Sequence, residues 1–69
     1  MRPNLKLKAL RVGSGMKQRD MSVLLGLKTE APYCQKENGK RQFSQREISI
    51  IAEHFNLTGN DIKSIFFTS

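Results

Sequence analysis

Residues 18–41 read QRDMSVLLGLKTEAPYCQKENGKR, and this stretch decides the fold that the sequence predicts. Met21 and Leu25 are spaced i, i+4, so a helix over residues 17–25 turns both side chains toward a core. Gly26 ends this helix, because glycine readily adopts the left-handed backbone conformation found at helix ends. The stretch therefore begins with a short amphipathic helix and a turn.

A second helix follows the turn and is predicted over residues 30–38. Thr29 is a good N-cap for this helix, since its hydroxyl can accept a hydrogen bond from a free N–H group of the first turn. Pro32 falls in that first turn, where its missing N–H has no intrahelical acceptor to lose. Gly39 lies just beyond the last turn and ends the helix.

Three further helices flank this pair. Asn4 can cap a helix over residues 5–14. The sequence SQRE at residues 44–47 is a capping box that opens another helix, and TGND at residues 58–61 caps the last one. Apolar residues recur at helical spacing along both later helices: Ile48, Ile51, Ala52, Phe55, Ile62, Ile65 and Phe66. The sequence thus predicts an all-α protein of five short helices in a single domain over residues 1–69.

The charge of the chain is unevenly distributed. Twelve Lys and Arg against six Asp and Glu give a formal net charge of +6. Residues 1–20 hold six basic residues and one acid, residues 21–43 hold four and two, and residues 44–69 hold two and three. Such a pattern favours one face turned toward a polyanion. The alternative is a charge that only keeps the surface soluble.

Composition argues against several classes of protein. Cys34 is the single cysteine, so no disulfide can form within the chain, and His54 is the one other residue with a sulfur or imidazole ligand for zinc. No apolar run approaches the ~18 residues of a membrane span. No nucleophile–base set, carboxylate pair or phosphate-cradling glycine loop is visible. We therefore expect a cytoplasmic protein that catalyses nothing and holds no metal or cofactor.

The sequence resembles the lambda-repressor-like helix-turn-helix family, also called Cro/C1 or XRE. The resemblance rests on Gln18 at the start of the first central helix, on the Gly26-Leu27 turn and on ENGKR at residues 37–41. Residues 56–67 resemble the end of small regulators of Gram-positive temperate phages. The resemblance implies a sequence-specific DNA-binding transcription regulator, Cro-like or a small repressor. It would bind double-stranded operator DNA as a homodimer in the nucleoid of a bacterial host.

The resemblance also implies which residues face the DNA backbone. In this family the first residue of the second helix reaches a phosphate, which points to Gln18 with its neighbour Lys17. The Asn of the ENG motif and the basic residues after it meet the backbone too, which points to Asn38, Lys40 and Arg41. Such contacts position a protein on DNA without reading its sequence.

A structural ion pair is implied by the same resemblance. The Arg on the last turn of the first helix and the Glu before the Asn-Gly pair often form it, so Arg11 and Glu37 are the candidates. Arg11 is then tied to Glu37 and not free to bind DNA. Removal of one partner would cost on the order of 3–5 kcal/mol, because a buried charge would be left without its partner.

Base edges are read by exposed side chains at the start of a helix held in the major groove. Gln35 can bind adenine through two hydrogen bonds, Glu30 can accept from a cytosine amine, and Ala31 can contact a thymine methyl. The candidate base-reading residues are Lys28, Thr29, Glu30, Ala31 and Gln35.

Some residues depart from the family pattern. The interval from Gly26 to Glu37 is one residue longer than in the commonest members. Pro32 stands where many relatives carry a base reader or an aliphatic core residue. Tyr33 is expected to fill the buried position, and Lys36 is expected to bury its stem and extend its ammonium group to solvent.

Apolar residues outside the predicted core faces favour a protein contact. Val23 and Leu24 are left over on the helix at residues 17–25. The Phe66-Phe67 pair is either one core residue plus one partly exposed residue, or part of a dimer interface. Glu30 in the reading helix, Pro32 and the Val23-Leu24 pair keep a second class of function open: a phage modulator or antirepressor that binds a repressor protein. The antitoxin of a toxin–antitoxin pair is a third.

Overall fold

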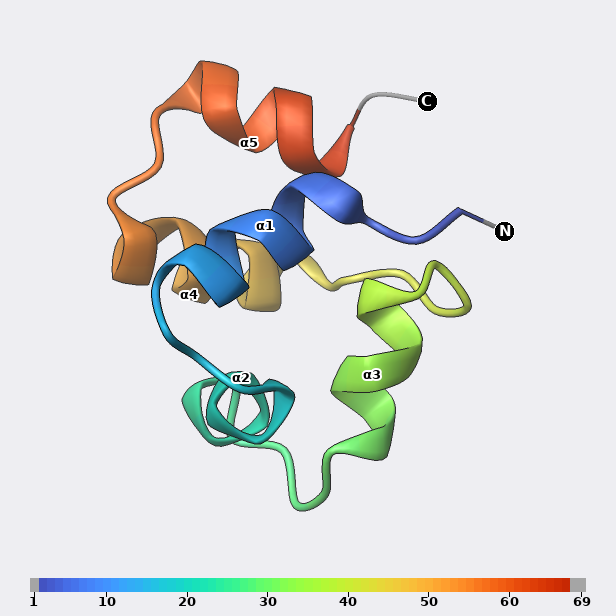
Figure 1. Ribbon diagram of the computed structural model, residues 1–69. Helices are drawn as coiled ribbons and strands as arrows, with labels where there is room; N and C mark the ends of the chain where they lie inside the picture. Colours follow the sequence, from blue (N-terminus) through green and yellow to red (C-terminus); the bar gives the residue numbers. More distant parts are fainter. Residues whose placement is uncertain (1, 68–69) are drawn as a thin grey trace.

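The computed structural model describes residues 2–67. Five helices follow one another along the chain: α1 (Leu5–Gly13), α2 (Gln18–Leu24), α3 (Ala31–Glu37), α4 (Gln45–Phe55) and α5 (Gly59–Phe66) (Figure 1). No strand occurs among the described residues. The prediction of an all-α chain with five short helices is confirmed, and the central pair begins and ends within one residue of the predicted positions.

Local side-chain caps explain where three of the helices begin. The Asn4 side chain accepts a hydrogen bond from the backbone N–H of Leu7, as predicted. Ser44 and Glu47 form the predicted capping box at α4, with distances of 3.1 and 2.9 Å for its two bonds. At α5, Thr58 forms a second capping box with Asp61. Each cap satisfies N–H groups that have no partner inside the helix.

The predicted N-cap of α3 is wrong. The helix begins at Ala31, and Glu30 takes the N-cap position without a side-chain hydrogen bond. The reason lies in the backbone: Glu30 already has helical dihedral angles, and its carbonyl accepts the first intrahelical bond, from the N–H of Cys34 at 2.9 Å. Thr29 therefore belongs to the connection. Pro32 lies in the first turn, as predicted.

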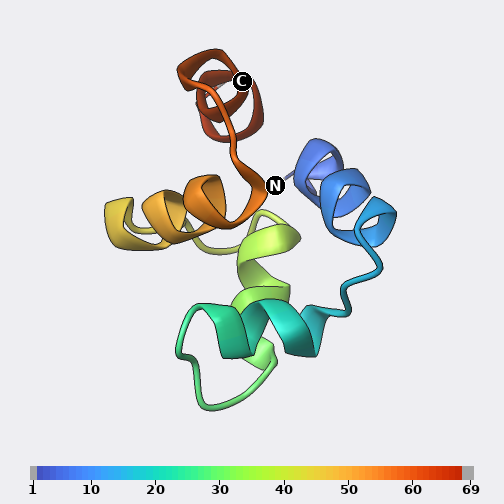
Figure 2. The ribbon, with the colours of Figure 1, turned by 90° about the vertical axis from the view of Figure 1, so that its left-hand side faces the viewer.

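Four of the helices surround the core, and the fifth covers it only partly. The fully buried apolar side chains are Leu7, Met21, Leu25, Tyr33 and Ile51. No residue of α5 is fully buried, although Ile65 and Phe66 pack against this core. Figures 1 and 2 show α5 at one end of the molecule and α2 at the other, with α1 and α4 between them. α3 contacts both α1 and α2.

No helix in the described part of the chain is both long enough and apolar enough to cross a bilayer.

Candidate nucleic-acid interface

A buried ion pair joins α1 to the end of α3. The guanidinium of Arg11 donates from Nε to Oε2 of Glu37 at 2.8 Å and from Nη2 to Oε1 at 3.0 Å. The two side chains are 9% and 3% exposed. This is the pair that the family resemblance implied. Its bidentate geometry is the strongest form of a charged hydrogen bond, and it holds Arg11 inside the molecule.

Two further donors complete the shell around the Glu37 carboxylate. The Tyr33 hydroxyl donates to Oε2 at 2.6 Å, and Nε2 of Gln18 donates to Oε1 at 3.3 Å. Each carboxylate oxygen therefore accepts two hydrogen bonds. Burial alone would raise the pKa of Glu37, but the bonds from Arg11 and Tyr33 outweigh burial, so this pKa lies below its ordinary value. Glu37 thus stays ionised and neutralised by its partner.

The network continues from Glu37 to the surface through Gln18. Oε1 of Gln18 accepts from the thiol of Cys34 at 3.2 Å, and the amide of Asn38 lies 4.0 Å from the same sulfur. Gln18 is the first residue of α2, whereas Cys34 and Asn38 belong to the last turn of α3 and its C-cap. The bonds therefore fix the start of α2 beside the end of α3. Sequence reasoning pointed Gln18 at a phosphate and missed these inward contacts.

The loop after α3 folds back onto the helix. The backbone N–H groups of Lys40 and Arg41 both donate to the carbonyl of Gln35, at 2.8 and 3.3 Å. The Arg41 guanidinium also donates to the Gln35 side chain at 3.4 Å. Lys40 and Arg41 are exposed, as are Lys17 and Asn38. The predicted backbone-contacting residues are thus brought to one region of the surface, with Gln18 half-buried among them.

The five predicted base-reading residues are all exposed: Lys28, Thr29, Glu30, Ala31 and Gln35. The first three lie in the connection and at the N-cap, and the last two lie on α3 itself. Glu30 pairs with Arg19 of α2 at 3.4 Å across open solvent. An exposed pair of this kind contributes little to stability, so both charges stay available to a partner.

Comparison with known proteins does not indicate what this surface binds. No protein-family model, curated protein or solved structure matches the chain. Within residues 2–67, no three His, Cys, Asp or Glu side chains gather where they could hold a metal ion. The groups that this surface exposes are cations, amides, the Glu30 carboxylate and the apolar residues considered next.

Apolar residues predicted to lie at a protein contact divide into two kinds. Val23 is 71% exposed and Phe67 is 66% exposed. Leu24 instead packs against the core, so its predicted outward position is wrong. Leu24 lies three residues after Met21 and therefore shares its face of the helix. Phe66 also packs inward, with its ring edge-to-face on Phe43 at 5.4 Å.

A second inward ion pair was missed. The Lys36 ammonium donates to Oε2 of Glu47, and the two side chains are 11% and 7% exposed. The prediction that Lys36 extends its charge to solvent is therefore wrong, because the capping carboxylate at the start of α4 lies within its reach. Burial raises the pKa of Glu47, but the bonds from Lys36 and Ser44 outweigh it and leave the pKa below its ordinary value.

Proposed function

We propose that the chain is a sequence-specific DNA-binding transcription regulator of the Cro or small-repressor kind. In this proposal α2, the turn after it and α3 form a lambda-repressor-like helix-turn-helix. One observation carries the proposal: a hydrogen-bonded network joins the start of α2 to the end of α3, and Lys17, Lys40 and Arg41 are exposed around it. Such a regulator acts in the cytoplasm, at the nucleoid of a bacterial host.

The charges in this region suit a phosphate backbone. Phosphate oxygens are bound by Lys, Arg and amide groups, which set the position of a protein on the duplex. The acid within the network, Glu37, is buried and neutralised by Arg11, so it does not oppose the exposed cations. Asn38 adds an exposed amide beside Lys40.

The outer face of α3 suits the major groove. Ala31, Gln35 and Asn38 are exposed and follow one another at i, i+4 and i+7, whereas Tyr33 and Glu37 are buried on the opposite face. A major groove about 12 Å wide admits one α-helix. With α3 in the groove, Gln35 reaches a base edge and the loop carrying Lys40 and Arg41 meets the flanking phosphates.

One copy reads one half-site, so we propose a homodimer on the operator. Two copies would place their α3 helices in successive major grooves, ~34 Å apart. The incompletely buried apolar face of α5, with Phe67 exposed at its end, supplies a surface for the second copy. This helix lies at the opposite end of the molecule from α2 (Figure 1).

The test is binding to duplex DNA at two salt concentrations. The chain is titrated against the DNA flanking its own gene and against a pool of random duplexes, at roughly 50 and 200 mM salt. Affinity should fall steeply with salt because bound phosphates release counterions. Arg41→Ala should weaken binding to all duplexes, whereas Gln35→Ala should relax the preference at one base pair. Lys63→Ala is the matched control, because Lys63 is exposed on α5 outside the apolar face of Ile62, Ile65 and Phe66.

A chain that gives no salt-sensitive binding to any duplex is not this regulator. Sedimentation of the complex counts the copies on the selected site. A single copy bound to a site without two-fold symmetry would remove the dimer from the proposal while leaving DNA binding in place.

A second candidate is a modulator that binds a repressor protein. Val23 favours it, because its exposed side chain borders a hollow of about 320 Å³ with Leu27 in its wall. Val23→Lys discriminates the two functions. A modulator should lose its partner with this change and keep it in Arg41→Ala, and a DNA regulator should show the reverse.

A further inference from the structure

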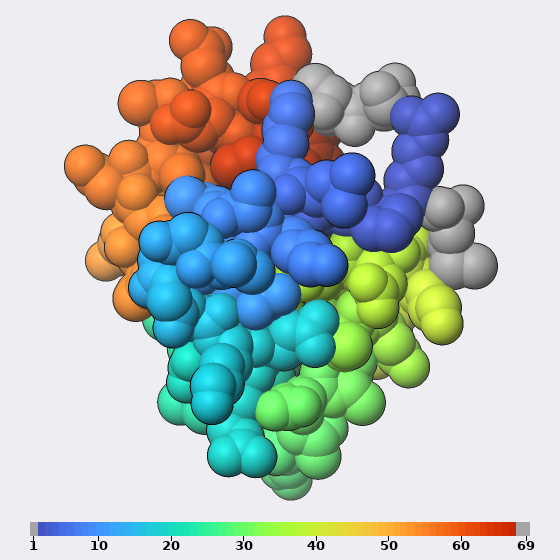
Figure 3. Space-filling view, in the orientation of Figure 1, coloured from blue at the N-terminus to red at the C-terminus, as the bar shows by residue number. Residues whose placement is uncertain are grey.

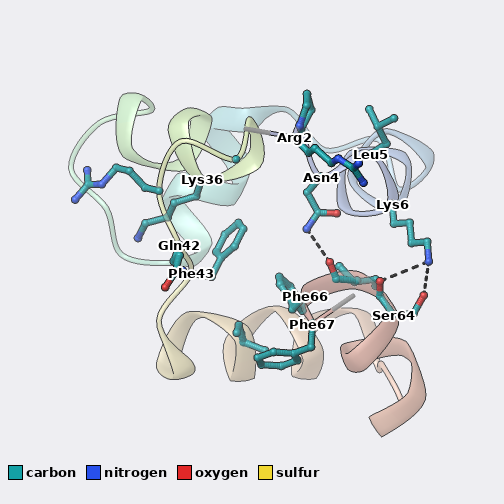
Figure 4. Close-up of a pocket in the computed structure, with 15 residues that line it drawn as sticks. Arg2, Asn4, Leu5, Lys6, Lys36, Gln42, Phe43, Ser64, Phe66 and Phe67 are labelled. Carbon is teal, nitrogen blue, oxygen red and sulfur yellow. Dashed lines mark hydrogen bonds between the residues drawn. The ribbon is translucent and has the colours of Figure 1, made fainter. Parts of the chain in front are cut away.

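The segment before α1 is fixed to two distant helices by Asn4. Its backbone N–H donates to the carbonyl of Glu37, the last residue of α3, at 2.7 Å. Its side-chain amide donates to the carbonyl of Ile65 in α5 at 2.9 Å (Figure 4). Its side-chain oxygen caps α1 by accepting from the N–H of Leu7. The backbone N–H, the side-chain amide and the side-chain oxygen of Asn4 each have a fixed partner, so the preceding residues leave α1 in a defined direction.

This direction places the backbone of Arg2 against Gly39. A Cβ atom at Gly39 would overlap the carbonyl oxygen of Arg2 and lie 2.8 Å from its carbonyl carbon. Gly39 also has a φ of +81°, which side chains rarely tolerate. The backbone of Arg2 therefore crosses the end of α3 at a distance that only glycine allows. In the space-filling view the dark-blue N-terminal residues lie directly beside the yellow-green end of α3 (Figure 3).

Arg2 thereby joins the charges of the loop after α3. Arg2 and Arg41 line the same groove, which has a volume of about 590 Å³. The titratable residues described in its lining are all cationic, namely Arg2, Lys6, Lys36 and Arg41. Lys36 is neutralised by Glu47, and Lys6 donates to Ser64. Arg2 and Arg41 remain exposed, and so does Lys40, which precedes Arg41 in the chain.

We propose that Arg2 is an additional phosphate contact of the DNA interface, held in place by the crossing over Gly39. The inference rests on the proposed function and extends the backbone-binding surface beyond α2 and the loop after α3. Its partner is a phosphate of duplex DNA that flanks those met by Lys40 and Arg41. The contact is independent of base sequence, because a guanidinium on a phosphate reads no base edge.

The test compares Arg2→Ala with Lys63→Ala, which removes one positive charge from an exposed position on α5 outside the apolar face of Ile62, Ile65 and Phe66. Binding of each full chain is measured on a selected duplex and on a scrambled duplex across a series of salt concentrations. Arg2→Ala should reduce the slope of log K against log salt by about 0.9, the loss of one phosphate contact. Its affinity should fall by the same factor on both duplexes, and Arg2→Lys should restore most of the slope.

Equal slopes and affinities for Arg2→Ala and Lys63→Ala would overturn the inference while leaving DNA binding intact. A loss confined to the selected duplex would overturn it as well, because it would indicate base reading. Absence of DNA binding by the unchanged chain would remove the proposed function and this contact together. Because the Arg2 side chain is exposed, thermal melts of the variant should match those of the unchanged chain.

Discussion

The hydroxyl oxygen of Tyr33 lies 2.6 Å from Oε2 of Glu37, the same oxygen that accepts a hydrogen bond from Nε of Arg11. Tyr33 is fully buried, so its ring fills the core while its hydroxyl serves a charged group. Burial, followed by the hydrogen bond to Glu37, raises the pKa of Tyr33. The phenol therefore remains protonated, and a donor to Glu37, at neutral pH.

Tyr33→Phe should lower the free energy of unfolding by about 1.5–3 kcal/mol, the range for a hydrogen bond to a charged group. The ring is kept, so no cavity contributes to this loss. Urea unfolding followed by circular dichroism measures it. A change below about 0.5 kcal/mol, the size of an ordinary surface substitution, would show that Arg11 alone satisfies the carboxylate.

Stability should fall in acid because Glu37 and Glu47 both have a folded pKa below the ordinary value of 4.5. A depressed folded pKa stabilises the protein above the unfolded pKa and loses this contribution as pH falls through the folded pKa. The free energy of unfolding should therefore be level from neutral pH to about pH 5 and decline below about pH 4.5. Urea unfolding at a series of pH values measures this, with exposed Glu53→Gln as the control variant. A level profile down to pH 3 would show that the hydrogen bonds to these two carboxylates do not lower their pKa values.

Gly39→Ala and Gly26→Ala form a matched pair of substitutions. Their φ angles are +81° and +73°, so each alanine costs roughly 1–2 kcal/mol of backbone strain. A Cβ at Gly26 meets nothing within 4 Å, whereas one at Gly39 overlaps the backbone of Arg2. Gly39→Ala should therefore cost about 1–3 kcal/mol more, as overpacking does. Equal losses in thermal unfolding would mean that the N-terminal segment moves aside freely.

Val23 and Leu24 should differ strongly in their response to a charged substitution, although they are neighbours. Val23→Lys should change stability by less than about 0.5 kcal/mol, because the side chain is 71% exposed. Leu24→Lys should cost several times more, since Leu24 packs against the core. A lysine in its place would bring an ammonium group against apolar side chains. Comparable thermal melts for the two variants would contradict the packing of Leu24.

The sequence predicted well the features that depend on residues close together in the chain. The caps at Asn4 and Ser44 depend on side chains that bind N–H groups three residues away, so their spacing alone indicates them. The inward faces of the helices follow from the same short-range periodicity. Leu24 shows the limit of such reasoning: it was assigned outward because Met21 and Leu25 already filled the inner face, yet the apolar face of a short helix is wide enough for three residues.

Long-range contacts in the candidate interface could not be predicted from spacing. Lys36 and Glu47 are eleven residues apart, and only the packing of α3 beside the start of α4 brings them together. The Arg11–Glu37 pair was expected through the family resemblance and not through any pattern in the chain. Gln18 was placed by the same resemblance, but its bonds to Glu37 and Cys34 depend on how α2 packs on α3.

The hydrogen bond from Asn4 to Ile65 joins positions 61 residues apart, so it ties the beginning of the described chain to its last helix. Local opening of α5 would break this bond, and with it one of the contacts that aim Arg2 across Gly39. The first turn of α1 and the last turn of α5 should then exchange their amide hydrogens as one cooperative unit. Any partner that draws α5 away from the body would loosen the amino-terminal segment at the same moment.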